Sequence, residues 1–279
     1  MNPLKALILG LVQGIAEFLP ISSSGHLELG KALFGLEELP LLFDVILHGA
    51  TLVVVVGIFK DRILAILKAL WNYLFHRSTQ PQKAKTKTQK KKDEAAAESL
   101  AYVVPILVAT VVTAAIGFVI EAFLPWNGVK AVSIQFIITA AVLLATMWAK
   151  PGNRGPAQIG LGRALCVGFA QGMGVFSGIS RSGMTIAASL FCGLSRATAG
   201  EFSFLLSIPA ILGALVLTLK DLGEMAAMVS WGQLALAFFA ALFSGWGALK
   251  VLLKVIKGGK LWVFAPYLLV AGLIGLILG

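Results

Sequence analysis

The chain contains two copies of one short motif, and their spacing limits the folds open to it. The first copy, residues 13–26, reads QGIAEFLPISSSGH, and the second, residues 171–184, reads QGMGVFSGISRSGM. Seven of the fourteen aligned positions are identical, at a constant offset of 158 residues in a chain of 279. An offset this large indicates a duplicated half and not a solenoid, whose repeats recur every roughly 20–50 residues. The sequence therefore predicts two related halves, 1–150 and 151–279.

The composition places both halves in a membrane. Apolar residues make up 58% of the chain, charged residues only 13%, and the mean hydropathy is +0.90. A soluble globule of this size cannot bury so much apolar surface, and several apolar runs approach the ~20 residues that span a bilayer. We therefore predict an all-α integral membrane protein. Its apolar start is expected to be retained and not cleaved as a signal peptide, because the same motif recurs deep in the chain.

Each motif copy interrupts an apolar segment that is too short to span a bilayer by itself. The first segment stops at Pro20 and a run of three serines, and the second stops at Gly178–Gly183. Broken segments of this kind are tolerated only where they are buried in protein or line a wet cavity. The sequence predicts re-entrant helical hairpins over 4–36 and 165–194.

Three transmembrane helices are expected after each hairpin. They are predicted at about 41–59, 101–123 and 130–149 in the first half, and at about 202–219, 231–250 and 261–278 in the second. Because an odd number of spans separates the two copies, the second half would enter the membrane from the opposite side. The prediction is an inverted-topology repeat whose two broken loops meet near the middle of the membrane.

The basic residues predict the orientation. Ten of the 23 Lys and Arg residues lie between Lys60 and Lys92. The positive-inside rule makes this stretch a cytoplasmic linker over 60–100 and not a nucleic-acid-binding surface, with Arg77–Glu98 as its flexible charged part. The first hairpin and both termini would then face outward.

Arg181 in the second copy needs a partner. An arginine at membrane depth costs at least ~2.5–3.5 kcal/mol unless something compensates it. An ion pair with Glu17 or Glu201 is one explanation. The other is an anion cradle, because the neighbouring residues are hydroxylated or permit a tight turn at the start of a half helix: Ser180, Ser182, Gly183 and Thr185. A guanidinium fork with hydroxyls and helix N–H groups suits the oxygens of a phosphate better than a single carboxylate.

The first copy supplies the complementary groups. Glu17 can hold a divalent cation or position water, and His26 can exchange a proton near neutral pH. Three serines stand where the returning half helix begins, as hydroxyl donors or as helix caps: Ser22, Ser23 and Ser24. Each residue taken singly is more often structural, but acid, base and arginine in repeated loops indicate one shared polar site.

Three further ionisable residues are interpreted as structural. Asp44 and His48 are four apart on the first expected span and face the same side, which predicts a hydrogen-bonded pair; the alternative is that they support the residues of the polar site from behind. Glu201 opens the fourth span, where a carboxylate suits the helix dipole, and it could also orient Arg181.

The segments 13–26, 178–185 and 201–206 together resemble the bacterial undecaprenyl-diphosphate phosphatases, the bacitracin-resistance proteins, and the resemblance covers nearly the whole chain. Two departures are visible. Gln13 replaces an acid often found there, and Ser177 stands where the family usually has proline.

The resemblance implies hydrolysis of a polyprenyl diphosphate to the monophosphate and inorganic phosphate in the bacterial cytoplasmic (inner) membrane, at a site opening to the periplasmic side. This reaction recycles the lipid carrier of cell-wall synthesis and confers bacitracin resistance. It also implies catalytic roles for Glu17, Ser23, His26 and Arg181, with His26, Ser23 or water as the nucleophile. The remaining motif residues would bind the diphosphate: Ser22, Ser24, Gly25, Ser180, Ser182, Gly183 and Thr185.

Further partners follow from the same resemblance. A divalent cation, Mg²⁺ or Ca²⁺, would be held by Glu17, with Gln13 as a second candidate ligand. The expected partners are the lipid substrate and membrane lipids, without nucleic acid, and a homodimer is one conceivable assembly. The alternative is a transporter or flippase of a polyprenyl phosphate or another anion, because inverted repeats with broken helices are also typical of transporters.

Overall fold

The protein is described by a computed structural model that covers residues 2–34, 41–75, 87–218 and 230–278. Helices account for most of these residues, and within the described ranges the only β-type pairing is one isolated bridge between Arg154 and Leu194. The α-helices are α1 (Pro3–Phe18), α2 (Ser23–Phe34), α3 (Leu41–Ile58), α4 (Lys60–Phe75), α5 (Lys87–Leu100), α6 (Val103–Phe123), α7 (Val129–Ala145), α8 (Gly160–Gly172), α9 (Arg181–Phe191), α10 (Arg196–Thr218), α11 (Trp231–Lys257) and α12 (Ala265–Leu278). Short 3₁₀ turns are η1 (Thr146–Trp148), η2 (Pro156–Gln158), η3 (Met173–Val175) and η5 (Leu261–Phe264).

Many of these helices are apolar enough for a bilayer. Four helices in the described ranges have the length and hydropathy to cross a membrane: Lys92–Phe123, Val129–Trp148, Arg196–Val216 and Trp231–Lys257. Two shorter apolar helices cover Phe43–Ile58 and Leu261–Ile277. Large apolar side chains also point outward, among them Phe118 and Phe243, which are 71% and 72% exposed. An apolar exterior of this kind needs lipid around it, which agrees with the predicted membrane class.

The helices pair across the two expected halves. Helix α1 packs on α11, α8 on α6, α3 on α10 and α7 on α12. Glycines permit the closest of these contacts: a Cβ atom at Gly10 would lie 2.9 Å from the Cα of Ala237, and one at Gly168 would lie 2.8 Å from the Cα of Ala109. Gly10 and Gly168 are separated by the same offset of 158 residues as the two motifs. The repeat therefore preserves one small-residue helix contact in both halves.

Local sequence explains the breaks in the two short helix pairs. Leu19 is extended because a residue before proline is disfavoured in the helical region, and Pro20 has no N–H to continue α1. Ser22 then takes a positive φ of 67° before α2 begins at Ser23. In the second copy, the side chain of Ser180 caps α9 by accepting a hydrogen bond from the Gly183 N–H at 3.1 Å.

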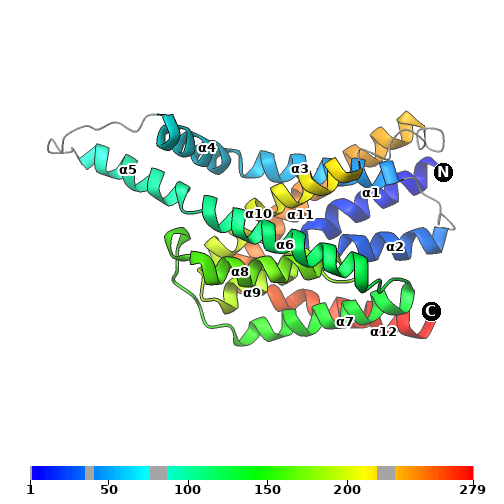
Figure 1. The fold of residues 1–279 in the computed structure, drawn as a ribbon. Coiled ribbons are helices and arrows are strands. Elements are labelled where there is room, and N and C mark those ends of the chain that lie inside the picture. The colour runs from blue at the N-terminus through cyan, green and yellow to red at the C-terminus, as the bar shows by residue number, and fades with distance from the viewer. Residues whose placement is uncertain (1, 35–40, 76–86, 219–229, 279) are drawn as a thin grey trace.

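Within the expected linker over 60–100 the described residues are helical, and α4 and α5 form an arm that extends beyond the rest of the bundle (Figure 1). The predicted flexibility of Arg77–Glu98 is therefore wrong for residues 87–98, which belong to α5. Lys, Glu and Ala dominate the described end of the arm, and all three are strong helix formers, so a high charge content does not prevent a helix. Residues 76–86, within the flexible part predicted for Arg77–Glu98, lie outside the described ranges.

Two predicted spans are longer than the sequence indicates. Helix α11 continues from 250 to Lys257. Two lysines in its last turn stabilise this extension, because their positive charge interacts favourably with the negative end of the helix dipole. Helix α10 begins at Arg196 and not at 202, because the side chain of Ser195 accepts a hydrogen bond from the Thr198 N–H at 3.1 Å.

Candidate active site

The two motif loops are in direct contact. The hydroxyl of Ser24 donates to the carbonyl oxygen of Ser177 at 2.8 Å, and the hydroxyl of Ser22 donates to the same oxygen. In the other direction, the hydroxyl of Ser182 donates to the carbonyl oxygen of Phe18 at 3.1 Å. The loops at the ends of α1 and α8 are therefore joined by reciprocal hydrogen bonds, although the bonded residues are more than 150 positions apart in the sequence.

The carboxylate of Glu17 lies at the centre of this contact. Its Oε1 accepts a hydrogen bond from Nη2 of Arg181 at 2.5 Å, and its Oε2 accepts one from the hydroxyl of Ser23, also at 2.5 Å. The amide of Gln13 donates to Oε2 at 3.2 Å. Only 6% of the Glu17 side chain is exposed, so these bonds form away from bulk water. Ser23 and Arg181 are thus linked through the carboxylate of Glu17.

A polar cavity of about 240 Å³ opens beside this carboxylate. Its lining includes several residues that the sequence predicts as catalytic or substrate-binding: Glu17, Ser22, Ser23, Ser24, Ser180 and Arg181. The apolar part of the wall comes largely from α10 and includes Ala210, Ile211 and Ala214. The cavity therefore has a charged, hydroxyl-rich side and an apolar side.

Arg181 keeps one donor available. Its Nη1 is buried and has no hydrogen-bond partner among the described residues, whereas Nη2 is held by Glu17. Gly174 leaves room for the side chain, because a Cβ atom at that glycine would lie 2.8 Å from the Cβ of Arg181. A buried cationic donor without a partner is costly, which indicates a ligand in the adjacent cavity. Helix α9 begins at Arg181 itself, and in its first turn the Gly183 N–H is already bonded by the Ser180 side chain.

His26 is not among the residues that line the cavity. Its Nδ1 lies 2.7 Å from the carbonyl oxygen of Ser22, and its Nε2 lies 2.6 Å from the hydroxyl of Tyr267. The ring stacks on Tyr267, with centroids 5.6 Å apart, and packs against Phe136. Both ring nitrogens are therefore engaged, and the ring supports the strained turn at Ser22.

The other expected phosphate ligands are turned toward the protein interior. The hydroxyl of Thr185 bonds the carbonyl oxygen of Arg181 at 2.9 Å and the hydroxyl of Ser203 at 2.5 Å. Gly25 fits closely against Phe136, since a Cβ atom there would lie 2.6 Å from its ring. Of the expected ligand residues, Ser182, Gly183, Thr185 and Gly25 do not line the cavity. These positions shape the two loops and do not form the wall.

The cavity is also lined by three polar residues that the sequence alone did not place in its wall: His48, Gln171 and Thr113. Nε2 of His48 lies 3.9 Å from Oε2 of Glu17, and its Nδ1 bonds the backbone oxygen of Asp44 at 2.8 Å. Gln171 donates to the hydroxyl of Thr113 at 3.1 Å. Gln171 is the repeat counterpart of Gln13, so the duplication offered a signal for it. His48 and Thr113 lie in apolar helices, where their sequence positions do not indicate what they face.

Two predicted pairings are corrected by the contacts. The carboxylate of Asp44 accepts from Nζ of Lys31 at 2.5 Å, so His48 pairs with the main chain of Asp44 and not with its side chain. Glu201 accepts from Nε of Arg62 at 2.5 Å and from the hydroxyl of Tyr102 at 2.8 Å. Glu201 therefore links α4 to α10 and is not the partner of Arg181.

The oxygen donors beside Glu17 suit a hard divalent cation. Oε1 of Gln13 is buried and has no hydrogen-bond partner among the described residues, and the same holds for Oε1 of Gln171. Mg²⁺ is typically bound by one or two protein carboxylates together with substrate phosphates and water. The described residues contain no cluster of three His, Cys, Asp or Glu side chains that could hold a metal without such help. The donor chemistry of Glu17 and Gln13 is therefore compatible with a hard divalent cation.

Comparison with known proteins identifies the family of the chain. The family model described as "Bacitracin resistance protein BacA" matches residues 6–274. The chain belongs to this family. A protein of Treponema denticola named undecaprenyl-diphosphatase is 44% identical over 273 residues, covering 98% of this chain and 96% of the relative. Relatives with the same name from Carboxydothermus hydrogenoformans and Methanosphaera stadtmanae are 41% and 38% identical, each covering 100% of this chain and 98% of the relative.

The BacA family match and the apolar helices together identify a multi-pass membrane protein. The match includes both motif copies, so the loops that meet at Glu17 and Arg181 belong to the region shared with the family.

Proposed function

We propose that this protein hydrolyses undecaprenyl diphosphate to undecaprenyl phosphate and inorganic phosphate. The observation that carries the proposal is the linkage of Ser23, Glu17 and Arg181 through one buried carboxylate at a polar cavity. The relatives at 38–44% identity bear the name of this activity. The released monophosphate is the lipid carrier of cell-wall synthesis, so the reaction recycles that carrier and accounts for bacitracin resistance.

Ser23 is the nucleophile in this proposal. Its hydroxyl donates to Oε2 of Glu17 at 2.5 Å, so the carboxylate can accept the proton as Oγ attacks the terminal phosphorus. The bond between the terminal phosphorus and the bridging oxygen breaks, and the prenyl monophosphate leaves with that oxygen. Glu17 passes the proton to the bridging oxygen of the leaving monophosphate and is again a carboxylate. Water then attacks the phosphoserine and gives a proton to Glu17, which returns it to Oγ of Ser23 as the phosphorus–Oγ bond breaks and inorganic phosphate is released. One water molecule is consumed overall.

Arg181 stabilises the phosphate that is transferred. Its free Nη1 supplies a donor for the equatorial oxygens, where charge is spread in the transition state. A divalent cation held by Glu17 and Gln13 would neutralise further charge on the diphosphate. His26 acts through its bond to the Ser22 carbonyl, which fixes the turn that presents Ser23.

The arrangement of helices supports the inverted repeat. Helix α1 of the first half packs on α11 of the second, and α8 of the second half packs on α6 of the first. A two-fold relation between inverted repeats requires this reciprocal pairing. Helices α1 and α2 lie toward the end with the chain termini, whereas α8 and α9 lie toward the arm of α4 and α5 (Figure 1). The two hairpins thus approach the site from opposite ends.

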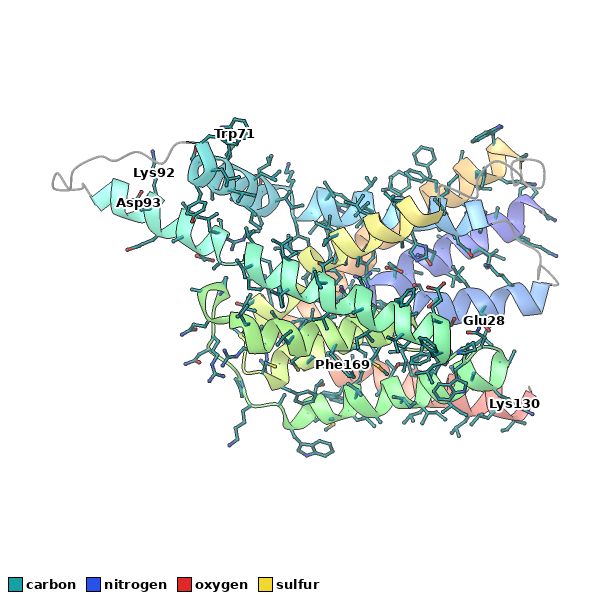
Figure 2. The ribbon with its side chains drawn as sticks, viewed as in Figure 1. Glu28, Trp71, Lys92, Asp93, Lys130 and Phe169 are labelled. Carbon is teal, nitrogen blue, oxygen red and sulfur yellow. The ribbon has the colours of Figure 1, made fainter. Side chains whose placement is uncertain are left out.

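The charge distribution supports an outward-opening site. Figure 2 places Lys92, beside the basic stretch, at the arm end of the molecule, and Glu28 and Lys130 at the opposite end. The positive-inside rule assigns the arm to the cytoplasm. The first hairpin, which carries Glu17 and Ser23, then enters from the periplasmic side of the cytoplasmic membrane.

The proposal is tested with purified protein in detergent, where no membrane exists to be crossed. Undecaprenyl diphosphate supplied with excess Mg²⁺ or Ca²⁺ should yield inorganic phosphate and prenyl monophosphate. A folded protein that releases no phosphate, but moves a prenyl phosphate between leaflets after reconstitution, would establish a flippase instead.

A further inference from the structure

A second cavity, of about 490 Å³, lies beside the polar one between α3, α10 and α11. Its wall includes Val45, Ile46 and Gly49 of α3, Leu215 of α10, and Trp231 and Phe238 of α11. All of its lining residues are aliphatic, aromatic or glycine. The volume falls within the roughly 300–1,000 Å³ typical of ligand sites. It is referred to below as the apolar cavity.

The two cavities share two helices. His48 of α3 and Ala214 of α10 line the polar cavity, and the next residue of each helix, Gly49 and Leu215, lines the apolar cavity. Successive residues of a helix point about 100° apart, so the cavities lie on adjacent faces of the same helix pair. The side of the polar cavity formed by α10 is itself apolar, so along α10 the lining passes from Ala214 to Leu215 of the apolar cavity without a polar residue between them.

We propose that the apolar cavity binds the first isoprene units of the substrate's prenyl tail while the diphosphate occupies the polar cavity. This inference rests on the proposed phosphatase function. A polyprenyl diphosphate joins a charged head directly to a chain with no polar atoms, and such a molecule needs a polar site continuous with an apolar one. Burial of apolar area would contribute binding free energy at about 25 cal/mol per Å². A phospholipid acyl chain is the competing occupant.

Gly49 provides a direct way to fill the apolar cavity. A Cβ atom added there meets no atom within 4 Å, so a larger side chain would extend into open space and not into protein. Gly49 lies inside α3, where replacing glycine also favours the helix. Gly247 of α11 is a matched control, because its Cβ position is equally open and it lines neither cavity.

The test compares wild type, Gly49→Phe and Gly247→Phe in phosphate release from undecaprenyl diphosphate and from methyl diphosphate, which carries no isoprene unit. Gly49→Phe should lower kcat/KM for the undecaprenyl substrate by about tenfold or more and leave kcat/KM for methyl diphosphate unchanged. Gly247→Phe should change neither value. An equal loss on both substrates, or no loss on either, would overturn the assignment. If Gly49→Phe does not fold, Ala235→Phe fills the same cavity from α11 and is judged by the same comparison.

A second measurement does not depend on turnover. A prenyl diphosphate carrying a photoreactive group in its first isoprene units should label peptides of α3 or α11, and undecaprenyl diphosphate should compete with that labelling. Equal competition by phosphatidylglycerol would show a general acyl-chain site, and labelling elsewhere would also refute the assignment. Labelling of α3 or α11 by a wild type that releases no phosphate would refute the phosphatase but keep the tail site.

Discussion

Replacing Arg181 with lysine should remove most of the activity without unfolding the protein. In the structure Nη2 of Arg181 binds Glu17 at 2.5 Å, and Nη1 is buried and free to bind substrate. Lysine keeps the charge and can keep the pair with Glu17, but it cannot place a second donor in the plane of the first. Loss of one such donor to a developing charge costs about 2.7–4 kcal/mol, and each 1.36 kcal/mol is tenfold in rate. The expected loss in kcat/KM is therefore about 10²–10³-fold.

The assay is phosphate release in detergent with saturating divalent cation, alongside a thermal unfolding scan. Arg62→Lys is the matched control: Arg62 also binds a carboxylate at 2.5 Å, that of Glu201, but it lies outside the polar cavity. That control should keep activity within about threefold of wild type, a difference of less than 1 kcal/mol. An Arg181→Lys protein with comparable activity would make the arginine a structural partner of Glu17 and refute the role assigned to Nη1.

Three further predictions concern the same site. Ser23→Ala should reduce phosphate release to background. Ser24→Ala should retain measurable turnover, because the Ser24 hydroxyl donates to the Ser177 carbonyl and not to Glu17, and equal activity of the two variants would show that Ser23 is not the nucleophile. Excess chelator should abolish turnover of the folded protein, and Mg²⁺ or Ca²⁺ should restore it, so full activity in chelator would exclude the cation from the reaction. His26→Ala should lower kcat, and Tyr267→Phe should reproduce part of that loss, because both residues support the Ser22 turn. An inactive His26→Ala protein together with a fully active Tyr267→Phe protein would indicate direct chemistry by His26.

The sequence predicted the meeting of the two motif loops because the duplication is visible in it. Identical Gln, Gly, Phe and Ser positions implied equivalent backbones, and the polar residues outside the shared frame implied a single site. The contact between Glu17 and Arg181 follows from that reasoning, although the pairing was only one of two explanations for the arginine.

Other features depend on three-dimensional contacts that the sequence does not encode locally. His48 lies in an apolar helix four residues after Asp44, which suggests a side-chain pair; only the packing of α3 against α1 shows that its Nε2 faces Glu17. Glu201 has several possible basic partners in the sequence, and only the position of α4 shows that Arg62 is the one that donates to it. Helix α5 departs from the predicted flexible segment because its charged and alanine residues also have high helix propensity, which charge content alone does not indicate.

Hydrolysis in ¹⁸O-labelled water tests the central claim most directly, because it reports which phosphorus is attacked. Wild-type protein with undecaprenyl diphosphate and divalent cation should place the label in inorganic phosphate and none in undecaprenyl phosphate, since water enters only when the phosphoserine at Ser23 is hydrolysed. Glu17→Gln should give neither product above background. Label in undecaprenyl phosphate would mean attack at the inner phosphorus, and absence of both products from folded wild type would contradict the phosphatase assignment.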